Sequence, residues 1–405
     1  MDEAKTRLTL VRNGKEEKLV LRENYVTFAD PGRTVSEVEA PVVFVCDGVT
    51  ALELGYDDYK GIDAKGKIAA FVFTAPNFES TVKAHYTSFA VKSANAVAHG
   101  AIGVILLCEP VFEKIYPFQE MARDLAFPHM RWLDKQGRPN DYWPELKGNA
   151  VLNLEATKKL FEGSGHPAEE VFAAIKEGKP TSFDLGVTAR IHNEAKLEDV
   201  QCPNIVAELE GSDPALQHEY VVYSAHVDHL GIGVPENGDN LYNGALDNAS
   251  GSAILLELAR AFRRMNPAPR RSILFVAVAG EEEGLLGSDY FAHYPTVAKA
   301  SMAANLNMDE DLMLWLLEDV IAFGAEHSTL QGVMEAAAKR MRMSLSPDPL
   351  PQEVVFIRSD QYSFVRQGVP AVFPVPGFKS SDPKIKPMEI FQNWGPHATT
   401  TREMT

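Results

Sequence analysis

A nearly unbroken apolar run, SILFVAVAG at 272–280, is followed directly by three glutamates, Glu281, Glu282 and Glu283. A short apolar run of this kind, with a glycine at its end, predicts a strand that is buried on both faces of a sheet. Three adjacent carboxylates at the end of such a strand repel one another, so we expect a positive charge beside them.

The chain from Pro203 onward alternates predicted strands with predicted helices. The strands are NIVAEL, EYVVYSAH, SILFVAVAG and AANLNM, and the helices run from about Ser250 to Met265 and onward from about Leu285. This alternation predicts an α/β fold with a mostly parallel or mixed sheet that is flanked by helices on both faces.

The chain before this region forms a separate α/β module in our prediction. Its expected strands and helices lie at 41–48, 65–73, 89–110, Ala156–Glu162 and Ala168–Lys176. Glycine, proline and charged residues interrupt the chain between about 134 and 200, as is typical of a connecting region. We therefore expect two domains, at 1–198 and 199–405.

Composition excludes several classes of partner. The chain has 405 residues and a net charge of −17, which disfavours nucleic acid or an anionic membrane as the main partner. Its three cysteines are far apart in apolar surroundings, which predicts core thiols: Cys46, Cys108 and Cys202. No apolar stretch is long enough to span a membrane and the first residues lack a secretory signal, so the chain as written predicts a cytoplasmic protein.

Potential metal ligands follow three of the predicted strands. His226 and Asp228 follow the second strand, Glu281–Glu283 the third and Asp309 the fourth, while Asp247 lies in the loop NGALDNASG. Side chains at the carboxyl ends of strands in an α/β sheet meet in one crevice. Taken singly, a histidine at a strand end or an aspartate before a helix is typical of structural hydrogen bonding. Together, these carboxylates need a cation to neutralise them, so a metal site is the better interpretation.

The ligand types indicate the metal. Imidazole and carboxylates without thiolates suit zinc, with cobalt or manganese as substitutes. The carboxylates are too many for one tetrahedral zinc, whereas two ions about 3.5–4 Å apart with a bridging carboxylate would use them and would activate water for hydrolysis.

Five segments in this order resemble the motifs of the dizinc aminopeptidases related to glutamate carboxypeptidase and the transferrin receptor. They are HVDHLG at 226–231, GALDNASG at 244–251, GEEEGLLGS at 280–288, NMD at 307–309 and SDQYSFVRQGVPAVF at 359–373. The first region resembles the protease-associated (PA) domain that many such enzymes carry as an insertion. The resemblance implies a zinc-exopeptidase, phosphorylase/hydrolase-like fold at 199–405 and a PA-like domain with a linker at 1–198.

The resemblance also implies metal ligands. His226 and Asp309 would bind one zinc, Glu282 would bind the second, and Asp247 would bridge both. The family supplies a further, C-terminal histidine to the second zinc. His397 is the only histidine after His327, but its surroundings, GPHATTT, do not match the family pattern. We expect an altered tail and a weakly bound second zinc, and the alternative is that His397 bends back into the site.

Further roles follow from the resemblance for residues beside the ligands. Glu281 would be the general base that takes a proton from the bridging water, and the Asp228 carboxylate would fix the tautomer of the zinc-binding imidazole. Glu283 receives no role, and we expect His229 and Asn248 to line the site or to be structural. Ser359 and Asp360 begin a segment that the family places near the site, although a helix-capping role also fits them.

The implied function is a zinc-dependent aminopeptidase that removes N-terminal residues from peptides, with activity reduced by the atypical C-terminus. One alternative is a carboxypeptidase or other amidohydrolase on the same site, for which Arg358 and Arg366 are the nearest basic residues. Another is a non-catalytic binding protein, like the receptor branch of the superfamily. Compared with family members, which are often secreted or periplasmic, the chain looks shortened at both ends.

Overall fold

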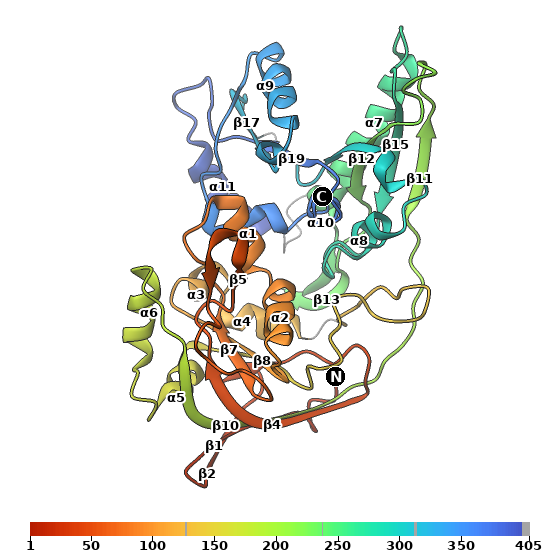
Figure 1. Cartoon of the computed structure of the whole chain (residues 1–405). Coiled ribbons are helices and arrows are strands. Elements are labelled where there is room, and N and C mark those ends of the chain that lie inside the picture. The colour runs from red at the N-terminus through yellow and green to blue at the C-terminus, as the bar shows by residue number, and fades with distance from the viewer. Residues whose placement is uncertain (126–127, 237, 312–313, 399–405) are drawn as a thin grey trace. The chain divides into compact units, whose positions relative to one another are not determined.

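The fold was analysed in a computed structural model, which describes residues 1–125, 128–236, 238–311 and 314–398 without the side chains of Asp124, Glu236 and residues 394–398. The chain divides into two compact units. One comprises Met1–Asp199 with Gln352–Val354, and the other comprises Val200–Pro351 with Val355–Thr405. Each unit has its own main sheet with helices beside it, which confirms the expected α/β class (Figure 1).

The first unit is built on an eight-stranded sheet in the order β2-β1-β10-β4-β7-β8-β9-β3. Its strands are β1 Arg7–Arg12, β2 Lys15–Leu19, β3 Tyr25–Val26, β4 Val35–Phe44, β7 Ile68–Val72, β8 Gly103–Leu107, β9 Asn149–Leu152 and β10 Phe183–Glu194. The pairs from β4 through β9 are parallel and the other pairs are antiparallel. A small hairpin adds β5 Thr50–Ala51 and β6 Tyr56–Asp57.

Helices cover both faces of this sheet. They are α1 Ser80–Thr87, α2 Phe89–Ala98, α3 Phe112–Ile115, α4 Phe118–Asp124, α5 Leu154–Phe161 and α6 Ala168–Lys176. Leu160 of α5 and Val171 of α6 belong to the core on one face, whereas Ala96 of α2 and Phe118 of α4 belong to the core on the other. The two short helices expected before residue 180 are therefore present as α5 and α6. The assignment of this unit to the PA class stays a prediction.

The second unit is built on a seven-stranded sheet in the order β11-β15-β12-β16-β19-β17-β18. Its strands are β11 Ile205–Leu209, β12 Tyr220–His226, β15 Ser272–Val278, β16 Met302–Asn307, β17 Asp319–Phe323, β18 Ser344–Leu345 and β19 Ala371–Pro376, beside a hairpin of β13 Gly231–Glu236 and β14 Asp239–Tyr242. The four central strands β15, β12, β16 and β19 are parallel. All four strands expected from the sequence of this region are present.

Strand β15 shows why its sequence is apolar at nearly every position. Ile273 and Phe275 pack in one core with α7 (Gly251–Arg264), which lies along β12 and β15 (Figure 1). Leu274 and Val276 pack in the opposite core with α8 (Leu286–His293) and α10 (Gln361–Arg366). Burial of each such side chain contributes about 1.5–3 kcal/mol, so both faces stabilise the strand that ends at the glutamates.

Two helices complete the unit, α9 Leu330–Arg340 and α11 Pro387–Ala398. Among the described residues of the whole chain, none of the helices combines the length and the apolar character that a bilayer crossing requires.

Candidate metal centre

Three adjacent parallel strands bring the expected ligands to one edge of the second unit's sheet. In the register of β12, His226 lies opposite Val278 of β15, and Ser224 lies opposite Asn307 of β16. The residues that follow each strand therefore emerge together, as expected for the carboxyl ends of parallel strands.

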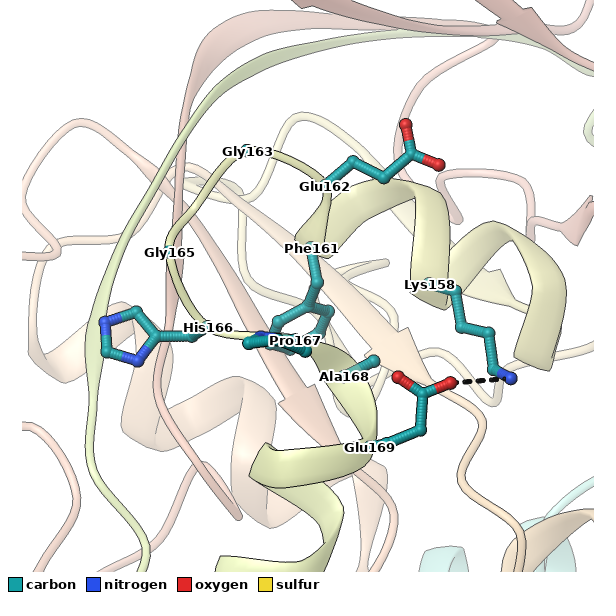
Figure 2. A pocket seen from close by; sticks show the side chains of 9 residues that line it. All are labelled: Lys158, Phe161, Glu162, Gly163, Gly165, His166, Pro167, Ala168 and Glu169. Carbon is teal, nitrogen blue, oxygen red and sulfur yellow. Dashed lines mark ion pairs between the residues drawn. The ribbon is translucent and has the colours of Figure 1, made fainter.

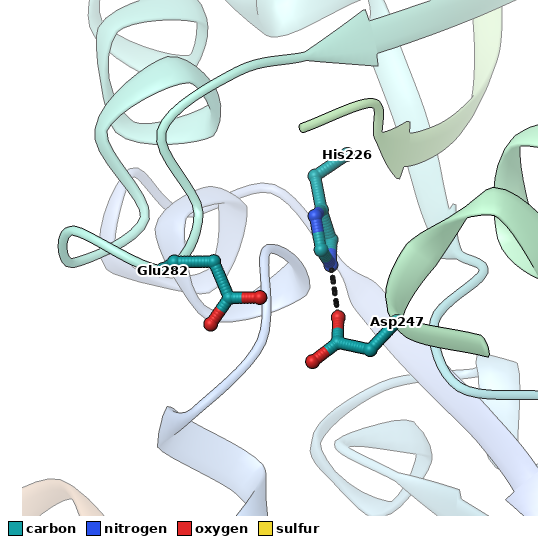
Figure 3. A group of neighbouring side chains, drawn as sticks. All are labelled: His226, Asp247 and Glu282. Atoms are coloured by element: carbon teal, nitrogen blue, oxygen red, sulfur yellow. Dashed lines mark ion pairs between the residues drawn. The ribbon is translucent and has the colours of Figure 1, made fainter. Parts of the chain in front are cut away.

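The His226 ring is fully buried and held in one orientation. Its Nδ1 lies 3.0 Å from the carbonyl oxygen of Asp228, which can only accept, so Nδ1 carries the proton. The opposite nitrogen, Nε2, then faces two carboxylates. It lies 3.1 Å from Asp247 Oδ1 (Figure 3) and 3.2 Å from Asp309 Oδ1. The sequence predicted the Asp228 carboxylate as the partner of this ring. Instead, the carbonyl of the same residue makes the contact.

This donor set fits a metal ion. An imidazole with a proton on Nδ1 presents a lone pair on Nε2, and a lone pair aimed at two carboxylates needs a cation between them. Burial opposes the charged ring, but hydrogen bonds to Asp247 and Asp309 outweigh it and raise the pKa of His226. Ligand atoms of His226, Asp247 and Glu282 all lie within 4.8 Å of one another, which is close enough to hold an ion.

The second oxygen of Asp247 faces a different set of groups. Its Oδ2 lies 3.9 Å from Nδ1 of His229, and that nitrogen lies 2.5 Å from Glu282 Oε1. Burial opposes ionisation of Asp247, but His226 and His229 outweigh it and lower the pKa of this carboxyl. Asp247 is therefore the carboxylate between two imidazoles.

Glu281 has neighbours that suit a proton acceptor. Burial and then the negative charge of Asp360 raise the pKa of Glu281 well above its ordinary value. Burial also raises the pKa of Asp360 to about 7, and the negative charges of Asp309 and Asp228 add to this. Two acids near His226, Glu281 and Asp360, thus have raised pKa values, and perturbed pKa values of this kind are common at functional sites.

A chain of buried hydrogen bonds holds Asp309, and no sequence pattern predicted it. Ser359 donates from Oγ to Asp309 Oδ2, and Asn307 donates from Nδ2 to Ser359 Oγ at 2.7 Å. Ser224 donates in turn to Asn307 Oδ1 at 2.8 Å. Both oxygens of Asp309 are thus engaged, one with Ser359 and one with His226, which fixes the direction of the carboxylate.

The other residues that the sequence predicted near the site make contacts outside this ligand cluster or have undescribed side chains. The Asp228 carboxylate accepts a hydrogen bond from the N–H of Gly280 at 2.6 Å and so ties the end of β12 to the glutamate loop. Asn248 is structural: it donates to the carbonyl of Met308 at 2.9 Å. Arg366 lies 3.7 Å from Asp289. His397 falls within α11, but its side chain lies outside the described part of the structure.

A hollow of about 490 Å³ in the first unit has a different character (Figure 2). It lies between α5 and α6, and its Lys158 and Glu169 pair with each other at 2.8 Å. His166, also in its lining, stacks on Phe183. The hollow thus lacks the converging carboxylates of the centre in the second unit.

Comparison with known proteins agrees with this centre. Residues 204–396 match Peptidase family M28, and this range includes His226, Asp247, Glu282 and Asp309. The second unit's central strands thus lie in a region that is similar to this peptidase family.

Two relatives are fungal proteins described as probable zinc metalloproteases. The chain is 38% identical to one from Pyrenophora tritici-repentis over 118 residues, which are 29% of this chain and 26% of that protein. It is 41% identical to one from Pyricularia oryzae over 125 residues, which are 31% of this chain and 23% of that protein. The matched stretch therefore spans about a quarter of the length of these relatives.

A solved structure shares the fold of this chain. It is described as an aminopeptidase from Aneurinibacillus sp. strain AM-1, with a TM-score of 0.50 and 19% sequence identity. The similarity covers 96% of this chain and 76% of that one.

Proposed function

We propose that this chain is a zinc-dependent aminopeptidase in which Asp247 bridges two metal ions. The observation that carries the proposal is the position of the Asp247 carboxylate. Its Oδ1 faces His226 and its Oδ2 faces the side where Glu282 and His229 meet. A carboxylate with one oxygen toward each of two ligand sets is the arrangement that a two-metal site requires.

His226 and Asp309 would hold one zinc, Glu282 would hold the other, and Asp247 would hold both. When bound, the zinc pair supplies Lewis-acid chemistry, because it lowers the pKa of water and polarises the peptide carbonyl. Glu281 takes the proton from the attacking water and returns it to the leaving amine. Its raised pKa makes it a stronger base than an ordinary carboxylate.

Two similarities support peptides as the substrate class. The fungal relatives are described as zinc metalloproteases, and the solved neighbour is described as an aminopeptidase. A carboxypeptidase would need a basic residue that faces the substrate carboxylate. Arg366, one candidate for this role, instead approaches Asp289 of α8 and is placed to pair with an acid of the fold. We therefore propose cleavage at the N-terminus of the substrate.

The test compares Glu281→Gln with Glu283→Gln, which changes a neighbouring glutamate of the same loop. We expect Glu281→Gln to bind zinc as the wild type does and to hydrolyse aminoacyl-anilides at least about 10²-fold more slowly, because the proton acceptor is lost. Glu283→Gln keeps nearly the wild-type rate. Near-normal hydrolysis by Glu281→Gln would reject Glu281 as the base.

Peptides with a blocked N-terminus test the direction of cleavage. An aminopeptidase releases residues from free N-termini and leaves N-acetylated peptides intact. Release of C-terminal residues from N-acetylated peptides would replace the proposal with a carboxypeptidase. A wild type that is saturated with zinc and hydrolyses neither substrate would support the binding-protein alternative.

A further inference from the structure

The side chain of His229 packs against a glycine, Gly244, in the loop before Asp247. The residue follows β12 and its side chain is only 10% exposed. Gly244 lies against it in a left-handed conformation with φ of 66°, and a Cβ atom on Gly244 would stand 2.7 Å from the Cβ of His229. A larger residue at position 244 would therefore displace the imidazole, so the loop before Asp247 and the ring of His229 fit together.

The ring is directed at the side of the site that His226 does not reach. His229 Nδ1 lies 2.5 Å from Glu282 Oε1 and 3.9 Å from Asp247 Oδ2. His226 Nε2 instead approaches Asp247 Oδ1, at 3.1 Å. The two imidazoles thus stand at opposite oxygens of one carboxylate, each with a further acid beside it.

We propose that His229 binds the second metal ion through Nδ1, together with Asp247 and Glu282. This inference rests on the proposed two-metal function and deepens it. It gives each ion one imidazole and two carboxylates: His226, Asp247 and Asp309 for the first, and His229, Asp247 and Glu282 for the second. Three protein ligands with a fourth position left for water is the usual composition of a catalytic zinc site.

The short contact between His229 and Glu282 is consistent with this role. At 2.5 Å, Nδ1 of the imidazole and Oε1 of the carboxylate point toward the same small space. Metal ions replace protons on imidazole and carboxylate ligands when they bind, so the same two atoms are placed to exchange one cation for another. The second ion then has a histidine ligand that does not depend on the C-terminal tail.

The experiment is a zinc titration of the full chain as wild type, His229→Ala, His397→Ala and His218→Ala. His218 is an exposed histidine of the same unit and controls for adventitious binding. We expect His229→Ala to keep the first zinc at wild-type affinity and to bind the second more than about 100-fold more weakly, because loss of a direct ligand exceeds the ~10–100-fold effect of an outer-shell loss. The two other variants bind both ions as the wild type does.

Cobalt distinguishes a ligand from a positioning residue. With zinc in the first site and saturating Co²⁺ in the second, the visible spectrum of His229→Ala differs from that of the wild type if an imidazole ligand has been lost. An unchanged spectrum would show that His229 only orients Glu282 and would overturn the inference. Unchanged second-ion affinity, a wild type that binds a single zinc, or loss of the second ion in His397→Ala instead would overturn it as well.

Different experimental results would reject the proposed function and this inference. A wild type that binds two zinc ions, one of them through His229, but hydrolyses no peptide would reject the peptidase proposal and leave the ligand assignment standing. A peptidase that keeps both ions in His229→Ala would do the reverse.

Discussion

Replacing Ser359 with alanine tests whether the buried hydrogen-bond chain positions a metal ligand. The change removes the donor to Asp309 Oδ2 and leaves Nδ2 of Asn307 without the acceptor that it has at 2.7 Å. Loss of an outer-shell partner of this kind weakens metal binding by about 10–100-fold. We therefore expect the first zinc to bind about 1.4–2.8 kcal/mol less favourably, at 1.4 kcal/mol for each factor of ten.

The assay is a competition titration of zinc against a chelator of known affinity. Ser363→Ala is the matched control, because Ser363 is an equally buried serine on α10 that accepts a hydrogen bond from Ser288 at 2.9 Å. Each variant removes a buried hydrogen bond and should cost stability, so stability alone does not separate them. Equal zinc affinity in the two variants would refute the positioning role of Ser359.

Three further outcomes are expected. Changing the fully buried Lys92 to methionine should lower the free energy of unfolding by about 1.5–3 kcal/mol, because its ammonium donates to the carbonyls of Val72 at 2.9 Å and Thr74 at 2.6 Å. Thermal unfolding beside the exposed Lys60→Met measures this, and equal melting temperatures would contradict it. Burial raises the pKa of Asp58 from 3.8 to about 7, so the folded state holds this proton more tightly and loses stability as the pH rises between these values. Asp58→Asn should remove this pH dependence, and parallel curves of stability against pH for the two proteins would contradict the prediction. His397→Ala should leave zinc binding unchanged, as expected for an altered tail, and a weaker second ion would show that the tail reaches the site.

The architecture of the second unit could be predicted from the sequence because burial on both faces of a strand makes the whole segment apolar. Strand β15 is apolar at nearly every position since α7 covers one of its faces and α8 with α10 covers the other. Once β12, β15 and β16 are recognised as parallel strands, their carboxyl ends have to share an edge. His226, Glu282 and Asp309 could therefore be placed together before any distance was known.

The details that the sequence missed depend on local geometry or on contacts between distant residues. Asp228 was expected to hold the His226 ring with its carboxylate, but the backbone turns so that its carbonyl does so and the carboxylate accepts from Gly280. Ser359 contacts Asp309 across 50 residues of chain, and a serine carries no signal that separates this role from helix capping. His229 was expected to line the site or to be structural, since its distance to Glu282 is set by the fold of the loop and no sequence pattern reveals it.

The most direct test of the bridging centre is the zinc content of Asp247→Ala beside two variants that each change a ligand of one ion. Asp309→Ala should lose the first zinc alone, and Glu282→Ala should lose the second alone. Asp247→Ala should lose both, since one carboxylate serves both ions and separates their charges. Two tightly held zinc ions in Asp247→Ala, or loss of only one of them, would contradict the account.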